Sequence, residues 1–215
     1  MSDRHQRLRQ ARLYLVCDEQ SDEFLERALS GGVDIVQLRI KDSADDERLV
    51  AVARRYARAT ARHGALLIVN DRPDLVTAAG ADGVHVGQDD VPVSQARDAV
   101  GRDRLMGLST HSPPQIDAAC ASGAGVDYIG VGPVHATPTK PGRAAVGLDL
   151  VRYAADNATM PFFAIGGVDE TSVDAVRDAG GRRVAVVRAL TESDDPQRTA
   201  RVLRASLEGA SVGAT

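Results

Sequence analysis

Apolar and polar positions follow one another along this chain in a unit that recurs eight times. Each unit is a short apolar run that ends in polar or glycine residues and is followed by a stretch with helical periodicity. The runs predict strands at Leu13–Cys17, Asp34–Arg39, Leu66–Asn70, Gly83–Val86, Leu105–Ser109, Tyr128–Gly132, Pro161–Ile165 and Val184–Val187. Because continuous apolar strands alternate with helices, the pattern predicts a parallel sheet that is covered on both faces.

The stretches between these runs have the periodicity of amphipathic helices. In the clearest of them, Asp45–His63, an apolar stripe runs through Leu49, Val52, Ala53 and Tyr56. Repeated units of this kind, without a Gly-x-Gly-x-x-Gly fingerprint, favour a closed barrel over an open doubly wound sheet. We therefore predict an α/β fold of the (β/α)8 TIM barrel type.

Length and composition fit one barrel domain over residues 1–215, since such barrels commonly run to about 200–250 residues. With 43% hydrophobic residues, 3% aromatic residues and no Trp, the core has to be built mainly from Ala, Val, Leu and Ile. We expect frayed termini at 1–10 and 209–215.

Charge and cysteine content exclude some classes of function. The net charge of −4 argues against general nucleic-acid binding. No long apolar run follows the charged N-terminus, so we expect neither a signal sequence nor a membrane partner, and a cytoplasmic location. Cys17 and Cys120 lack metal-ligand spacing and are interpreted as reduced packing residues.

The segment Asp34–Lys41 carries the most informative chemistry. In a strand, Gln37, Arg39 and Lys41 would converge on one face. Arg supplies a planar fork of donors and Lys a point charge, a combination that suits phosphates. The pattern predicts an anion clamp; the alternative is an ordinary exposed strand whose charges are merely solvated.

Carboxylates follow the next two predicted strands. Asp71 comes directly after the third strand, and Asp89 and Asp90 lie in the loop after the fourth. The active site of such a barrel lies where its strands end, so Asp71 and one of the later aspartates could reach one cation. Oxygen ligands without a Cys or His set favour Mg²⁺ over Zn²⁺. The alternatives are a helix cap for Asp71 and a solvated loop for the other two.

Hydroxyl and imidazole groups add to this rim. Ser109 ends the fifth strand without a nucleophile elbow, so we expect it to bind a ligand or to cap a helix. His85 should point into the barrel, where a structural role is favoured over a general base. The same interpretation applies to His111 and His135.

A second anion site is predicted farther along the chain. The long connection 133–147 carries two threonines and Lys140, as binding loops and lids do, although a plain surface insertion is the alternative. Gly166 and Gly167 follow strand seven and Arg188 follows strand eight, the usual place of a barrel phosphate site. A tight turn is the alternative for the glycine pair. The rim would thus bind a diphosphate and a monophosphate.

Six motifs taken together resemble the thiamine phosphate synthase family. They are Gln37-x-Arg39-x-Lys41, Asn70-Asp71, His85-x-Gly87-Gln88-x-Asp90, Gly107-x-Ser109-x-His111, Gly132-Pro133 with Thr137-x-Thr139-Lys140, and Ala164-Ile165-Gly166-Gly167. Each motif is weak alone, but their order and spacing are preserved from about Leu13 to Leu207. The resemblance implies condensation of 4-amino-2-methyl-5-pyrimidinylmethyl diphosphate with 4-methyl-5-(2-phosphoethyl)thiazole, which releases diphosphate and gives thiamine phosphate.

The resemblance also implies roles for individual residues. Asp71 and Asp90 would hold Mg²⁺, and Arg39, Lys41 and Lys140 would assist departure of the diphosphate. The pyrimidine substrate would be bound by Gln37, Leu38, Arg39, Ile40, Lys41, Asn70, Ser109 and Lys140. The thiazole phosphate would be surrounded by Thr137, Pro138, Thr139, Gly167, Val187 and Arg188.

Some positions depart from the family pattern. Gly181-Arg182-Arg183 replaces a common Ala-Asp-Gly stretch, Arg188 replaces a frequent serine, and His135 stands where a larger aromatic residue is expected. Two other functions are compatible with the barrel: a related thiazole tautomerase, which should not need both the clamp and the aspartate pair, and a non-catalytic sensor of phosphate ligands. The sequence is compatible with a monomer and with a homo-oligomer.

Overall fold

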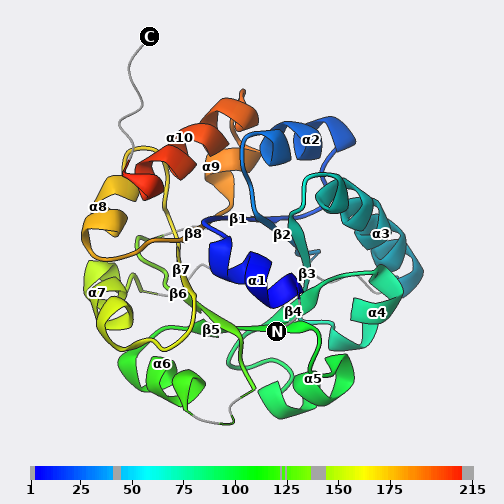
Figure 1. Cartoon of the computed structure of the whole chain (residues 1–215), viewed down its shortest axis with the longest axis horizontal. Coiled ribbons are helices and arrows are strands. Elements are labelled where there is room, and N and C mark those ends of the chain that lie inside the picture. Colours follow the sequence, from blue (N-terminus) through cyan, green and yellow to red (C-terminus); the bar gives the residue numbers. More distant parts are fainter. Residues whose placement is uncertain (1–2, 41–44, 122, 124, 137–143, 210–215) are drawn as a thin grey trace.

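Eight parallel strands close into a barrel in chain order, and helices surround it (Figure 1). The computed structural model describes residues 3–40, 45–121, 123, 125–136 and 144–209. The strands are β1 (Leu13–Cys17), β2 (Ile35–Leu38), β3 (Leu66–Asn70), β4 (Gly83–Val86), β5 (Leu105–Thr110), β6 (Tyr128–Val131), β7 (Phe162–Ile165) and β8 (Val184–Val186). The predicted (β/α)8 TIM barrel is confirmed.

The helices follow the strands and cover the outside of the barrel. They are α2 (Asp22–Ser30), α3 (Asp46–Arg62), α4 (Val76–Ala79) after a 3-10 turn η1 (Pro73–Leu75), α5 (Val93–Val100), α6 (Pro113–Cys120), α7 (Gly147–Asn157), α8 (Val173–Asp178), α9 (Arg188–Thr191) and α10 (Pro196–Glu208). Asp45 caps α3 by accepting a hydrogen bond from the Arg48 amide at 2.9 Å, as its short polar side chain favours. Within the described residues, no helix is both long and apolar enough to cross a membrane.

Alternation along the strands divides the core in two. On β2, Val36 and Leu38 are buried toward the helices, whereas Ile35 joins a smaller cluster inside the barrel. The larger cluster lies between strands and helices and consists mainly of Ala, Val, Leu and Ile, as the composition predicted. Because side chains alternate along a strand, strands such as β1, β2 and β3 supply both clusters.

Residues 3–10 form a helix, contrary to the expected fraying at 1–10. Asp3–Gln10 forms helix α1, which lies across the barrel axis in Figure 1. Leu8 is only 2% exposed and belongs to the inner cluster, and the Arg4 guanidinium pairs with Asp82 at 2.7 Å. Sequence periodicity missed this helix because a single leucine among polar residues gives no apolar stripe. At the other end, Gly209 closes α10 with a φ of 72°, and residues 210–215 lie outside the described residues.

Candidate active site

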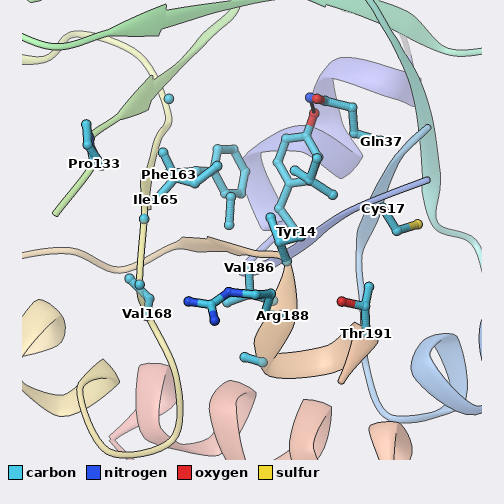
Figure 2. Close-up of a pocket in the computed structure, with 18 of the residues that line it drawn as sticks. Tyr14, Cys17, Gln37, Pro133, Phe163, Ile165, Val168, Val186, Arg188 and Thr191 are labelled. Atoms are coloured by element: carbon cyan, nitrogen blue, oxygen red, sulfur yellow. Dashed lines mark hydrogen bonds between the residues drawn. The ribbon is translucent and has the colours of Figure 1, made fainter. Parts of the chain in front are cut away.

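A cavity of about 1320 Å³ opens where the strands end. Figure 2 shows part of its lining, with side chains from β1, β2, β7 and β8 arranged around one space. The predicted residues that line it are Gln37, Arg39, Ile40, Asn70, Ser109, Gly167, Val187 and Arg188. Parallel strands bring their carboxyl ends to one rim, so residues far apart in sequence meet here.

Three aromatic rings form the floor of the cavity. Phe163 packs edge to face against Tyr14 and Tyr128, with ring centroids 5.2 Å and 5.7 Å away. Burial raises the pKa of both tyrosines well above the ordinary value, so both hydroxyls stay protonated. Neither tyrosine was among the residues predicted for the site. Their inward-facing positions at strand starts were the available signal.

Two residues of the predicted anion clamp, Gln37 and Arg39, lie at different depths in the cavity. Gln37 is 4% exposed, and its amide nitrogen donates to the Tyr14 hydroxyl at 2.6 Å (Figure 2). Arg39 lies higher, at the rim, and is half-buried. Leu38 points into the helix-facing core and is 1% exposed, so its side chain does not reach the cavity. Lys41 lies outside the described residues.

Asp71 and Asp90 come together at the ends of β3 and β4. Asp71 has a φ of 58°, a left-handed conformation that Asp and Asn tolerate better than most residues, and its amide donates to the His85 carbonyl at 2.9 Å. Asp90 accepts from the Gly87 amide at 2.8 Å. Burial, and then the negative charge of Asp90, raise the pKa of the Asp71 carboxyl to about 6.

This pair of carboxyl groups has the chemistry of a divalent cation site. Two hard oxygen donors meet, and the nearby Arg39 charge lowers the pKa of Asp71 less than burial and Asp90 raise it. Among the described residues, no group of three or more Asp, Glu, His or Cys side chains surrounds a metal position. Mg²⁺ commonly uses one or two carboxylates and completes its shell with water and substrate phosphates, so the pair could hold it. Asp89 is exposed beside them.

Ser109 and His85 meet inside the barrel. The Ser109 hydroxyl lies 2.9 Å from His85 Nε2, and His85 Nδ1 lies 3.3 Å from the Tyr128 hydroxyl. His85 points inward and is 9% exposed, as its alternation with Val84 and Val86 predicted. His111 instead donates through its backbone amide to Gln115 and contacts the Gly132 carbonyl through its ring.

The predicted phosphate region lies across the cavity from β2. Gly166 and Gly167 have φ values of 106° and 64°, which L side chains rarely adopt, and a Cβ at Gly167 would lie 2.7 Å from His135 Cβ. Arg188 begins α9 and reaches into the cavity (Figure 2). Its side chain is 44% exposed and lies 4.0 Å from Glu192. Thr137, Pro138, Thr139 and Lys140 lie outside the described residues.

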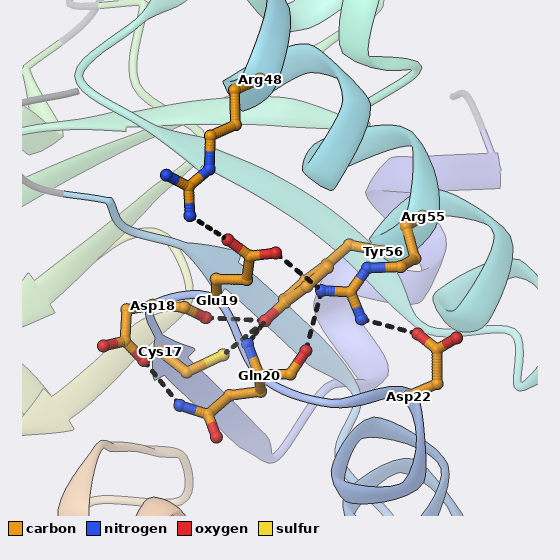
Figure 3. Close-up of polar contacts among 8 residues, drawn as sticks. All are labelled: Cys17, Asp18, Glu19, Gln20, Asp22, Arg48, Arg55 and Tyr56. Atoms are coloured by element: carbon orange, nitrogen blue, oxygen red, sulfur yellow. Dashed lines mark hydrogen bonds and ion pairs between the residues drawn. The ribbon is translucent and has the colours of Figure 1, made fainter. Parts of the chain in front are cut away.

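The loop between β1 and α2 borders the cavity and is held by α3 (Figure 3). The Tyr56 hydroxyl donates to the Asp18 carbonyl at 2.6 Å and accepts from the Gln20 amide at 2.8 Å. Arg55 donates to the Gln20 carbonyl at 2.8 Å. Cys17 lies below the same hydroxyl, and burial raises the pKa of its thiol to about 12, which suits a packing residue. Tyr56, part of the apolar stripe predicted on α3, therefore also holds the β1–α2 loop through its hydroxyl.

Comparisons with known proteins agree with one another. A family model described as thiamine monophosphate synthase matches residues 13–190. The thiamine-phosphate synthase of Arthrobacter sp. (strain FB24) is 48% identical over 230 residues, covering 94% of this chain and 96% of the relative. That of Mycobacterium sp. (strain KMS) is 51% identical over 214 residues, covering 93% and 94%. The structure of thiamine phosphate pyrophosphorylase from Pyrococcus furiosus matches with a TM-score of 0.84 at 28% identity, covering 95% and 98%.

We predict that Tyr56→Phe lowers the free energy of unfolding by about 1–3 kcal/mol, because it leaves two backbone groups of the β1–α2 loop without their partner. Tyr153→Phe is the matched control, since that hydroxyl donates to the Asp117 carboxylate at the surface, at 2.8 Å and 2.9 Å. Its loss should stay below about 1 kcal/mol. Urea unfolding measures the loss of stability in both variants. Equal losses would contradict the role of Tyr56 in holding the β1–α2 loop.

A second prediction uses the titration of Asp71 in protein freed of metal. Its pKa is about 6 in the folded state against an ordinary 3.8, so protonation favours the fold at low pH and this stabilisation is lost as pH rises through about 6. Asp71→Asn keeps a residue that tolerates positive φ but cannot ionise. The variant should therefore gain stability relative to the wild type between about pH 4 and about pH 7.

Unfolding by urea at both pH values checks this expectation. Asp89→Asn removes a negative charge from the same rim and serves as the control. If the free energies of unfolding of Asp71→Asn and wild type differ by the same amount at both pH values, folding does not raise the pKa of Asp71.

Proposed function

This chain belongs to the thiamine monophosphate synthase family, and we propose how its rim carries out the transfer that unites 4-amino-2-methyl-5-pyrimidinylmethyl diphosphate with 4-methyl-5-(2-phosphoethyl)thiazole. The observation that carries the proposal is that one cavity is lined by Arg39 and Asn70, which adjoin the carboxylate pair, and also by Gly167 with Arg188. Two phosphorylated substrates need two anion sites with their reacting ends between them.

The diphosphate side is built around Asp71 and Asp90. These carboxylates would hold Mg²⁺, and Arg39 would bind the diphosphate beside them, because its charge already acts on Asp71. Asn70 and Ser109 line the cavity next to this position and would contact the pyrimidine substrate. Lys41 and Lys140 are assigned to the same diphosphate by family resemblance.

The thiazole side is built from backbone and one guanidinium. Gly167 and Val187 would approach the phosphate through their backbone, with Thr137, Pro138 and Thr139 assigned there by resemblance. Among the described residues, the carboxylate that pairs with Arg188 is that of Glu192 at 4.0 Å, and the Arg188 side chain is exposed, so it can turn to a phosphate. The His135 Nε2 atom is buried beside Gly167 without a hydrogen-bond partner among the described residues, and a phosphate oxygen would give it one.

The reaction needs no nucleophile from the protein. In this dissociative substitution the C–O bond would break first, and its electron pair would leave with the diphosphate. The positive charge left on the methylene would be delocalised by the aminopyrimidine ring, and the free lone pair of the thiazole nitrogen would then form the new C–N bond. Bound Mg²⁺ would supply charge neutralisation for this leaving group. Arg39, with Lys41 and Lys140, would stabilise the same growing charge, and such preorganised donors are each worth about 10²–10³ in rate.

The protein should form thiamine phosphate from both substrates only with a divalent hard cation present. Chelation should abolish turnover, and added Mg²⁺ should restore it. Asp71→Asn and Asp90→Asn should each reduce kcat/KM far more than the control Asp89→Asn. All three substitutions remove one negative charge, but only the first two remove an oxygen assigned to the metal. Full activity after rigorous chelation would overturn the metal assignment.

Arg188→Ala should raise the KM for the thiazole phosphate about tenfold or more, because a charge-assisted contact of about 1.5–3 kcal/mol is lost. The KM for the pyrimidine diphosphate should change little. Arg182→Ala removes the same charge before β8, at the opposite end of the strand, and is the control. An unchanged thiazole-phosphate KM would mean that backbone donors bind this phosphate without the guanidinium.

A further inference from the structure

Five polar side chains form a continuous hydrogen-bonded chain through the barrel interior. Gln37 Nε2 lies 2.6 Å from the Tyr14 hydroxyl, which lies 3.0 Å from the Tyr128 hydroxyl. Tyr128 then contacts His85 Nδ1 at 3.3 Å, and His85 Nε2 contacts the Ser109 hydroxyl at 2.9 Å. All five residues line the cavity; Gln37, Tyr14, Tyr128 and His85 are buried, and Ser109 is the half-buried end of the chain.

The barrel makes room for this chain at one glycine. Gly107 on β5 stands in register with His85 on β4 and with Tyr128 on β6. A Cβ at Gly107 would collide with the Tyr128 ring and its hydroxyl and with His85 Nδ1. Because β5 has a glycine at this level of the barrel, His85 on β4 and Tyr128 on β6 can form a hydrogen bond directly.

The chemistry of the members gives the chain a direction. An amide nitrogen only donates, so Tyr14 accepts from Gln37. Within this chain the Tyr128 hydroxyl is then the acceptor available to the Tyr14 hydrogen. Tyr128 in turn gives its hydrogen to Nδ1 of His85, which must then carry its proton on Nε2. Ser109 accepts from that nitrogen and has its own hydrogen left to donate.

We propose that this chain fixes His85 as the Nε2–H tautomer and thereby makes the Ser109 hydroxyl a committed donor to a ring nitrogen of the pyrimidine. The inference rests on the proposed function for the identity of the ligand. Pyrimidine ring nitrogens only accept hydrogen bonds, so a committed donor recognises them. Tyr14, Tyr128 and His85 act through Ser109 and are positioning residues.

The opposite direction is the alternative that the experiment has to exclude. If the Gln37 carbonyl oxygen faced Tyr14, each hydrogen would point the other way, His85 would carry its proton on Nδ1, and Ser109 would be an acceptor. The two directions therefore differ in an observable that does not depend on catalysis.

Nitrogen-15 NMR of the histidine side chains reads this observable in the wild-type protein without substrate. Spectra are recorded well above the ordinary histidine pKa of about 6.5, and His85→Gln identifies the signals. We expect a protonated Nε2 and an unprotonated Nδ1. A protonated Nδ1 would overturn the proposal whether or not the protein makes thiamine phosphate.

Variants then test whether the direction of the hydrogen bonds affects binding of the pyrimidine substrate. Tyr128→Phe removes the donor to Nδ1 and should mix the His85 tautomers, while Tyr153→Phe, which removes a hydroxyl at the surface, should leave them unchanged. In kinetics, Tyr128→Phe should raise the KM for the pyrimidine diphosphate about 5- to 10-fold with the thiazole-phosphate KM unchanged. An unaltered tautomer signal, or equal changes in both KM values, would contradict the proposal. If the wild-type protein made no thiamine phosphate at all, this result would count against the proposed function alone.

Discussion

The close approach of Asp71 and Asp90 is the interaction around which this rim is organised. Pairing of β3 with β4 fixes the two strand ends side by side, and the half-buried carboxyl group of Asp71 meets that of the exposed Asp90. Burial, and then the like charge of Asp90, oppose ionisation of Asp71 and raise its pKa. An arrangement that costs stability in the free protein is understandable if a cation and a phosphorylated substrate complete it.

The interior beneath this rim follows a different rule. Polar groups inside a barrel are tolerated when each has a partner, and the Tyr14, Tyr128 and His85 side chains satisfy one another across three strands. Gly107 is the structural condition for that contact. The rim thus uses charge to hold phosphates, whereas the floor uses uncharged hydrogen bonds of fixed direction to present groups to a heterocycle.

Sequence reasoning predicted the barrel and the convergence of β3 and β4 because both follow from periodicity and from the rule that parallel strands end at one rim. It placed Gln37 at the rim because alternation gives the face of a strand but not the depth in the barrel. It missed Tyr14 and Tyr128 because their contact depends on register between strands far apart in the chain, and α1 because only Leu8 is buried. The roles of Lys41 and Lys140 stay predictions.

Binding of Mn²⁺ as a spin probe, titrated by electron paramagnetic resonance with and without inorganic diphosphate, tests the central claim most directly. If Asp71 and Asp90 hold a divalent cation together with the diphosphate, each ligand should tighten the binding of the other, and Asp71→Asn or Asp90→Asn should abolish this coupling while Asp89→Asn preserves it. Mn²⁺ binding that is indifferent to diphosphate, or to both substitutions, would contradict the account.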